Sequence, residues 1–194
     1  KALKLAELSN NKIDIAITYQ RIALMHTKKG NFNESLEPLT KALSIYQQLK
    51  DLKNVAAVHI QIALSYGQQK KNTLAVKELG SAVDASKRAK DTFSLGIIYE
   101  QLGNLYTNIG DFENSLHFHK ASLEMSKHLK DWKGVADSYS DIGNIYLAQK
   151  KYTKALESNQ SALELYKQYA EEAAIAESHM ILGQVYMYMK QPLK

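Results

Sequence analysis

The sequence repeats itself with a period of forty residues. An apolar position recurs with this period, a small residue follows it each time, and an aromatic ring usually stands three positions further on. The apolar column contains Ile22, Ile62, Leu102, Ile142 and Leu182, the small column Ala23, Ala63, Gly103, Gly143 and Gly183, and the ring column His26, Tyr66, Tyr106, Tyr146 and Tyr186. The register holds without an insertion or a deletion. A fixed period of this length is typical of solenoid proteins, whose units bury their apolar faces on their neighbours.

Each period contains two helical patterns. Apolar residues spaced three and four apart, such as Ile98, Leu102 and Leu105, indicate one face of an α-helix. Short polar residues that can cap free N–H groups precede the first pattern at Asn11, Asp51, Asp91 and Asp131. We expect a first helix (helix A) at about 12–28, 52–68, 92–108, 132–148 and 172–188, and a second (helix B) at about 32–49, 72–89, 112–129 and 152–169. Pro38 falls inside the first helix B and is expected to bend it.

The same period sets the domain organisation. We expect a single all-α solenoid over residues 1–194, with full repeats at 11–50, 51–90, 91–130 and 131–170. Residues 1–10 align with the end of a preceding helix B, and residues 171–194 form a partial repeat. Because natural solenoids end in polar capping units, we expect this sequence to be a fragment of a longer array.

Small residues form a stripe along helix A. A second small column, made of Ala16, Ala56, Gly96, Ala136 and Ala176, lies seven residues before the first one. Seven residues are about two helical turns, so the two columns share one face of the helix. Glycine inside a helix costs up to about 1 kcal/mol relative to alanine. We therefore predict that Gly103 lies where a neighbouring helix approaches closely.

One repeat resembles a known family signature. Leu102, Gly103 and Tyr106, followed by Gly110, Phe112, Ser115 and Leu116, resemble the tetratricopeptide repeat (TPR). The usual repeat has 34 residues, and lengthened repeats look like those of kinesin light chains and bacterial signalling proteins. The resemblance implies a right-handed superhelical solenoid of antiparallel helix pairs, with helix A lining a concave inner face.

The sequence offers little for catalysis or metal binding. It has no cysteine, which excludes disulfides, thiolate metal sites and cysteine nucleophiles. Neither an HExxH motif, a glycine-rich phosphate loop nor a nucleophile elbow is present. Three histidines, His26, His59 and His179, stand in columns shared with tyrosines and are interpreted as packing rings. We expect a non-catalytic protein without cofactor or metal.

Charge and hydropathy limit the kinds of partner that we expect. The net charge is +5, but the lysines are scattered and form no basic stripe, so we expect no nucleic-acid partner. No run approaches the roughly 18 apolar residues that span a bilayer. We expect no membrane association and a cytoplasmic location.

The expected concave face carries the candidate binding residues. Steps of three and four along helix A select Gln20, Glu100, Asn104, Asn108, Asp137, Ser140, Asn144, Met180, Gln184 and Tyr188. Among them Asn104, Asn144 and Gln184 share one column and would form a ladder of amides. Because an amide both donates and accepts hydrogen bonds, the ladder could hold the backbone of an extended peptide. Equally, these could be solvated surface residues. In the first two repeats the column holds Leu24 and Leu64.

These observations favour one function and leave an alternative open. We expect a protein- or peptide-binding module, the interaction or sensor region of a larger bacterial signalling or regulatory protein. The alternative is a structural scaffold, or an array that self-associates through its exposed ends, without a ligand in the groove.

Overall fold

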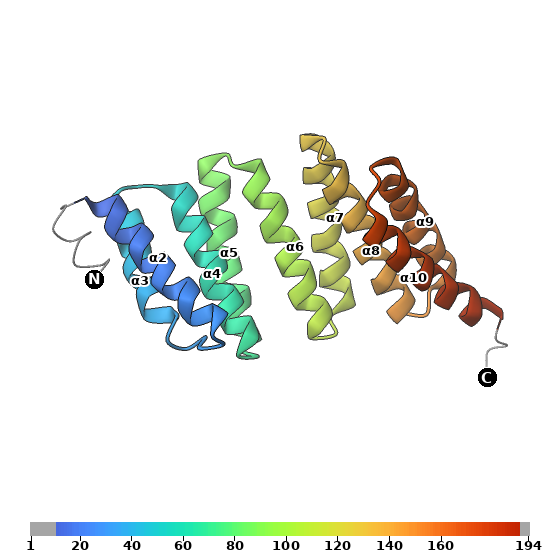
Figure 1. Cartoon of the computed structure of the whole chain (residues 1–194), viewed down its shortest axis with the longest axis horizontal. Coiled ribbons are helices and arrows are strands. Elements are labelled where there is room, and N and C mark those ends of the chain that lie inside the picture. Colours follow the sequence, from blue (N-terminus) through green and yellow to red (C-terminus); the bar gives the residue numbers. More distant parts are fainter. Residues whose placement is uncertain (1–10, 191–194) are drawn as a thin grey trace. The chain divides into compact units, whose positions relative to one another are not determined.

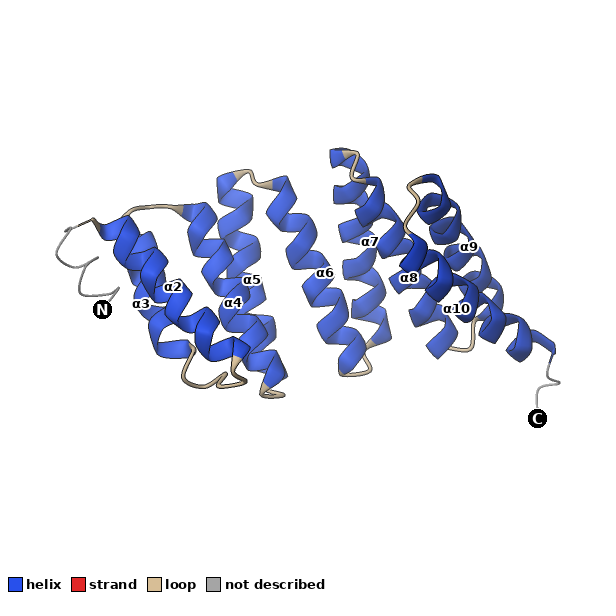
Figure 2. Ribbon diagram, viewed as in Figure 1, coloured by secondary structure: helices blue, strands red, loops and turns tan. Residues whose placement is uncertain are grey.

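The computed structural model of the chain describes residues 11–190, and all regular structure in that range is α-helical. Short loops join the helices (Figure 2). The A helices are α2 (Lys12–Lys28), α4 (Leu52–Gln68), α6 (Thr92–Asn108), α8 (Trp132–Ala148) and α10 (Glu172–Lys190). The B helices are α3 (Leu36–Gln48), α5 (Asn72–Ala89), α7 (Phe112–Leu129) and α9 (Tyr152–Gln168). The expected helix over residues 1–10 lies outside the described residues.

The predicted helix boundaries are largely confirmed. Helices α2, α4, α6 and α8 begin directly after the capping column, and their bounds match the expected ranges. The carboxylate of Asp51 accepts a hydrogen bond from the backbone N–H of Asn54 (3.2 Å), and that of Asp131 from the backbone N–H of Gly134 (3.1 Å). These bonds satisfy N–H groups that have no partner inside the helix. The polar column therefore fixes the start of α2, α4, α6 and α8.

The first B helix differs from its prediction, because Pro38 shortens it rather than bending it. Helix α3 begins at Leu36, whereas the other B helices begin at the second residue after the turn. Pro38 then lies in the first helical turn, where a missing N–H removes no intrahelical bond. A helix starting at residue 32 would place the proline ring against the carbonyl of residue 34.

Left-handed residues end many of the helices. Gly30 and Gly110, which stand two repeat periods apart after the ends of α2 and α6, have φ angles of 77° and 80°. Lys70 and Lys150 replace glycine at the same place and adopt φ angles of 59°. A side chain in this region costs roughly 1–2 kcal/mol, so these turns are less favourable than the glycine turns.

The chain consists of two compact units. The N-terminal unit extends to Ile98 and the C-terminal unit begins at Tyr99, within α6. In the N-terminal unit α2 packs on α3 and α4 on α5, and in the C-terminal unit α8 packs on both α7 and α9 (Figure 1). No helix within residues 11–190 is long and apolar enough to cross a membrane.

Candidate functional site

Gly103 on α6 lies directly against the ring of His119 on α7. A Cβ atom at Gly103 would come within 2.5 Å of His119 Cδ2. The His119 side chain is almost completely buried, with 1% of its surface exposed. The hydroxyl of Ser115, also on α7, donates to the Gly103 carbonyl at 3.0 Å. The prediction that Gly103 marks a close approach of two helices is confirmed.

The next repeat has the same arrangement with a different polar residue. A Cβ at Gly143 would collide with the amide of Asn159, which is 1% exposed. The Asn159 Nδ2 donates to the carbonyl of Ala155 at 2.9 Å, and its Oδ1 has no hydrogen-bond partner within residues 11–190. At the fifth small-column position the rule fails, because a Cβ at Gly183 would meet nothing within 4 Å.

The buried His119 ring faces Asp141 on α8. Its Nδ1 lies 3.3 Å from Asp141 Oδ2, which is within ion-pair distance. The alignment is not that of a hydrogen bond, and Nδ1 has no hydrogen-bond partner within the described part of the chain. Burial lowers the pKa of His119 to about 4, so the ring is neutral at neutral pH.

Asp141 belongs to a group of four carboxylates on three helices, which we call the acidic cluster: Glu100 on α6, Asp137 and Asp141 on α8, and Glu177 on α10. Burial, followed by repulsion from the other three, raises the pKa of Asp141 to about 7. The pKa of Glu100 is also raised, first by burial and then by Asp137. The charges therefore act on one another across the three helices.

The surroundings of the acidic cluster offer it no cation. Within residues 11–190 no lysine or arginine forms an ion pair with any of the four carboxylates. The hydroxyl of Tyr166 on α9 donates to Asp137 Oδ1 at 2.7 Å, and burial, followed by this bond, raises the pKa of Tyr166. No three His, Asp or Glu side chains in the described range are placed to hold a metal ion.

The predicted binding residues divide between the two units. In the C-terminal unit Asn104 and Ser140 are half-buried, while Asn108, Asn144, Met180 and Gln184 are exposed. No hydrogen bond within residues 11–190 engages the side chains of the three ladder amides, Asn104, Asn144 and Gln184. Gln20, in the N-terminal unit, accepts from the Tyr46 hydroxyl at 2.9 Å and donates to Gln61 at 3.3 Å. Its polar atoms are therefore already engaged within the chain.

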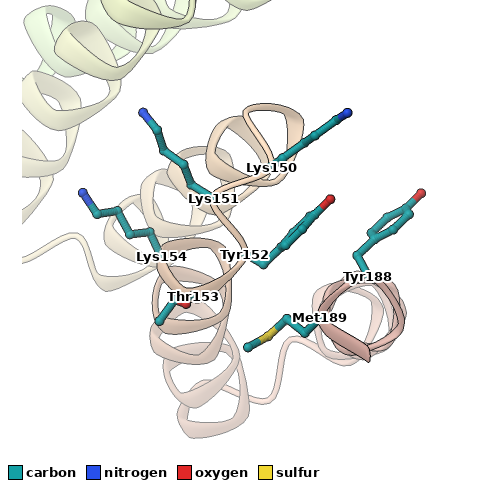
Figure 3. Close-up of a pocket in the computed structure, with 7 residues that line it drawn as sticks. All are labelled: Lys150, Lys151, Tyr152, Thr153, Lys154, Tyr188 and Met189. Atoms are coloured by element: carbon teal, nitrogen blue, oxygen red, sulfur yellow. The ribbon is translucent and has the colours of Figure 1, made fainter. Parts of the chain in front are cut away.

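Tyr188, the last predicted binding residue, is engaged with a B helix. Its ring stacks on that of Tyr152 on α9, with the ring centroids 5.7 Å apart. The two rings border a pocket together with Met189 and three lysines, Lys150, Lys151 and Lys154 (Figure 3). Tyr188 is thus engaged with α9, and the pocket that it borders is not lined by any of the ladder amides.

Sequence reasoning missed His119 and Asp141. Neither residue stands among the candidate binding residues of helix A. The repeat register does contain a signal. At the position of His119 the other repeats carry Leu39, Leu79 and Asn159, and the change from leucine to a polar residue accompanies the change from Ala23 and Ala63 to glycine.

Comparison with known proteins identifies the repeat. Sequence profiles described as tetratricopeptide repeat match residues 94–168 and residues 15–49, together more than half of the chain. The chain belongs to the tetratricopeptide repeat superfamily. TPR arrays generally bind proteins or peptides. No curated protein matches the sequence of this TPR chain.

Solved structures share the all-α TPR-like fold. BtubC (BKLC) from P. vanneervenii superimposes with a TM-score of 0.86 at 18% identity, over 97% of this chain and 80% of its own. A STAND ATPase with a tetratricopeptide repeat sensor, from Pyrococcus horikoshii, gives 0.85 at 17% identity over 95% of this chain and 29% of its own. A kinesin light chain-like protein of Podospora anserina gives 0.73 at 14% identity, over 88% and 85%. Such identities establish the fold alone.

Proposed function

We propose that this TPR chain is a non-catalytic module that binds an extended peptide or protein segment, as the interaction or sensor region of a larger cytoplasmic signalling or regulatory protein. One observation carries the proposal. The amides of Asn104, Asn144 and Gln184 occupy one position in three consecutive repeats of the C-terminal unit, and none forms a hydrogen bond within residues 11–190. They are therefore available to a ligand.

The recurrence of the ladder amides suits an extended peptide. They stand on consecutive A helices, so a peptide that runs across these helices would meet one amide per repeat. Each residue of such a peptide presents a backbone N–H donor and, at its carbonyl, an acceptor. An amide side chain can donate to a peptide carbonyl and accept from a peptide N–H. Such contacts read the backbone, while neighbouring side chains select the sequence.

The comparisons support this class of function. TPR repeats generally bind proteins or peptides. The Pyrococcus horikoshii STAND protein carries its tetratricopeptide repeats as a sensor, and this chain matches 29% of that protein's length. A sensor region within a longer regulatory protein is the corresponding role for this chain.

A double variant tests the ladder. A random peptide library displayed on phage is selected on the chain, and the recovered peptides are titrated against Asn104→Ala with Asn144→Ala. Each lost amide leaves a buried donor or acceptor of the peptide unpaired, at roughly 1–3 kcal/mol. Binding should weaken by about tenfold to several hundredfold, if water recovers part of that cost.

The control separates binding from folding. Gln168→Ala removes an exposed amide at the end of α9 and should change neither property. The double variant should unfold at the same temperature as the unmodified chain. Equal affinity for the selected peptides, or early unfolding of the double variant, would contradict the ladder.

A second candidate function rests on helix α10. Met180, Tyr186, Met187 and Met189 on this helix are large and exposed. Exposed apolar patches often mark interaction surfaces, so self-association through α10 is the alternative. Sedimentation of the chain with and without Met180→Ser and Met187→Ser distinguishes the two. A dimer that these substitutions dissociate would favour self-association as the function over ligand binding.

A further inference from the structure

The acidic cluster combines carboxylates that repel one another. Glu100, Asp137, Asp141 and Glu177 come from three A helices, and no lysine or arginine within residues 11–190 pairs with them. An exposed acidic surface would screen such repulsion with water and salt. Asp141 has only 34% of its side chain exposed, however, and Glu100 is half-buried. The cluster therefore contains more negative charge than its surroundings neutralise.

A second feature at the same place points to a ligand. His119 is 1% exposed, and its Nδ1 lies 3.3 Å from Asp141 Oδ2 without a hydrogen bond within residues 11–190. A buried polar atom without a partner is costly, and leaving one in place calls for a reason. Leu39 and Leu79 show that the scaffold accepts an apolar side chain at this position. In the C-terminal unit the polar ring of His119 occupies this position instead and lies next to the Asp141 carboxylate.

We propose that the acidic cluster is a subsite for an arginine side chain of the bound peptide. The proposal rests on the proposed peptide-binding function and specifies the chemistry of its ligand. Asp141 forms the floor of the subsite, backed by His119. Asp137 is oriented by the Tyr166 hydroxyl at 2.7 Å, and Glu100 and Glu177 flank the two aspartates from the neighbouring helices.

Arginine fits this arrangement better than lysine. A guanidinium has five N–H donors in a planar fork and can bond carboxylates on several helices at once. An ammonium is a point charge with three donors and a more strongly held water shell. The subsite lies on the same helices as the ladder amides, since Asn104 follows Glu100 by one helical turn and Asn144 follows Asp141 by three residues. One peptide can therefore occupy both.

Titration of two tripeptides tests the subsite directly. The probes are acetyl-Ala-Arg-Ala-amide and the same peptide with citrulline, which keeps the shape of arginine and lacks its charge. Isothermal titration should give a Kd of roughly 1 mM for the arginine peptide and at least about tenfold weaker binding for citrulline. The corresponding lysine peptide, acetyl-Ala-Lys-Ala-amide, should bind with an affinity between those of the arginine and citrulline peptides. Equal affinity of the arginine and citrulline peptides, or no heat with either at roughly 10 mM, would overturn the proposal.

Charge-neutral variants locate the binding. Asp141→Asn and Glu177→Gln should each weaken the arginine peptide, by about tenfold and about threefold respectively, because Asp141 is the more buried. Glu177 is exposed, so its replacement does not endanger folding. Glu157→Gln removes an exposed charge from α9 and serves as the matched control, with unchanged affinity. Loss of affinity in the control equal to that in Asp141→Asn would assign the effect to net charge and overturn the subsite.

Proton release gives a readout that a structural role of Asp141 would not produce. Five titratable groups act on Asp141 or lie beside it: Glu100, Asp137, Glu177, Tyr166 and His119. A guanidinium beside Asp141 lowers the pKa of that carboxyl from about 7, so binding at neutral pH releases part of a proton. The binding heat should then depend on the ionisation enthalpy of the buffer, and Asp141→Asn should abolish the dependence. Buffer-independent heat in the unmodified chain would contradict the proposal.

The two proposals fail in different ways. If phage-selected peptides need Asn104 and Asn144 but bind equally well when their arginines become citrulline, the subsite is wrong and the peptide-binding function stands. If the arginine tripeptide binds the cluster but the double amide variant binds selected peptides normally, the ladder is wrong and the subsite stands.

Discussion

The N-terminal and C-terminal units place different residues on the same helical scaffold. In the first, the small residue of helix A is Ala23 or Ala63, the residue at the position of His119 is Leu39 or Leu79, and all are buried. In the second, the pairs are Gly103 with His119 and Gly143 with Asn159. The polar atoms of Gln20 are engaged within the N-terminal unit. In the C-terminal unit the ladder amides form no hydrogen bond within residues 11–190, and no lysine or arginine of that range pairs with the acidic cluster.

The difference shows what a repeat can change without losing its fold. An alanine and a leucine fill the contact between the two helices with apolar volume, which stabilises the repeat. Replacing alanine by glycine makes room for a histidine or asparagine, whose buried polar atoms reduce stability. The exchange of an apolar pair for a glycine and a buried polar residue thus falls in the unit where we propose binding, and such a local loss of stability is expected at a functional site.

The largest expected effect comes from filling the glycine contact. Gly103→Leu places a large side chain where His119 already lies, and such overpacking costs about 1–3 kcal/mol. The loss should centre on repeats two to four, because a solenoid couples mainly neighbouring units. Thermal unfolding followed by circular dichroism measures it.

Gly67→Ala provides the matched control for this variant. A Cβ at Gly67 would meet nothing within 4 Å, so the gain in helix propensity, up to about 1 kcal/mol, should stabilise the chain. An unchanged unfolding temperature for Gly103→Leu would show that the interhelical contact is wrongly assigned.

A double substitution replaces the glycine–histidine pair of the C-terminal unit with the alanine–leucine pair of the N-terminal unit. Gly103→Ala alone should cost about 1 kcal/mol, since the new Cβ meets the His119 ring at 2.5 Å. Gly103→Ala with His119→Leu recreates the pair found at Ala63 and Leu79 and should recover that loss. A double variant less stable than the single one, measured by urea unfolding, would show that the two units do not follow a common packing rule.

The pH dependence of stability distinguishes the contribution of His119 from that of Asp141. The folded-state pKa of His119 is lowered to about 4 by burial, so its contribution to stability falls as the pH drops from about 6.5 toward 4. The pKa of Asp141 is raised to about 7, mainly by burial and then by the neighbouring carboxylates. Its stabilising contribution is full below about 3.8 and is lost as the pH rises through about 7.

The opposite slopes overlap and largely cancel in the unmodified chain. Asp141→Asn should leave the His119 slope, with stability falling from about pH 6.5 to 4. His119→Leu should leave the opposite slope, with stability falling as the pH rises toward about 7. Glu100 and the other titrating groups are common to all three chains. If the urea midpoints of the unmodified chain and the two variants changed with pH in parallel, the opposite contributions of His119 and Asp141 would be refuted.

The smallest effect belongs to the N-terminal unit. Tyr46→Phe removes the hydrogen bond from its hydroxyl to Gln20, and the stability should fall by about 0.5–1.5 kcal/mol. Affinity for the arginine tripeptide should stay the same, because neither residue belongs to the acidic cluster. A changed affinity would show that the binding face extends to the N-terminal unit.

Local rules in the sequence predicted the helices well and the site only in part. Capping residues such as Asp51 and Asp131 act within a few residues, so the sequence places them reliably. Pro38 was misjudged because its effect depends on where the helix begins. The proximity of His119 and Asp141 depends on how the helices pack, and the shifts of their pKa values depend on burial. A repeat column in the sequence contains neither kind of information.

A map of backbone amide shifts tests the arginine subsite most directly. Nuclear magnetic resonance spectra are recorded while acetyl-Ala-Arg-Ala-amide is added to the chain. We expect the shifted amides to lie on α6, α8 and α10 around Glu100, Asp141 and Glu177, and the citrulline peptide to leave them nearly unchanged. Shifts centred on α2 and α4, or equal shifts with both peptides, would contradict the arginine subsite.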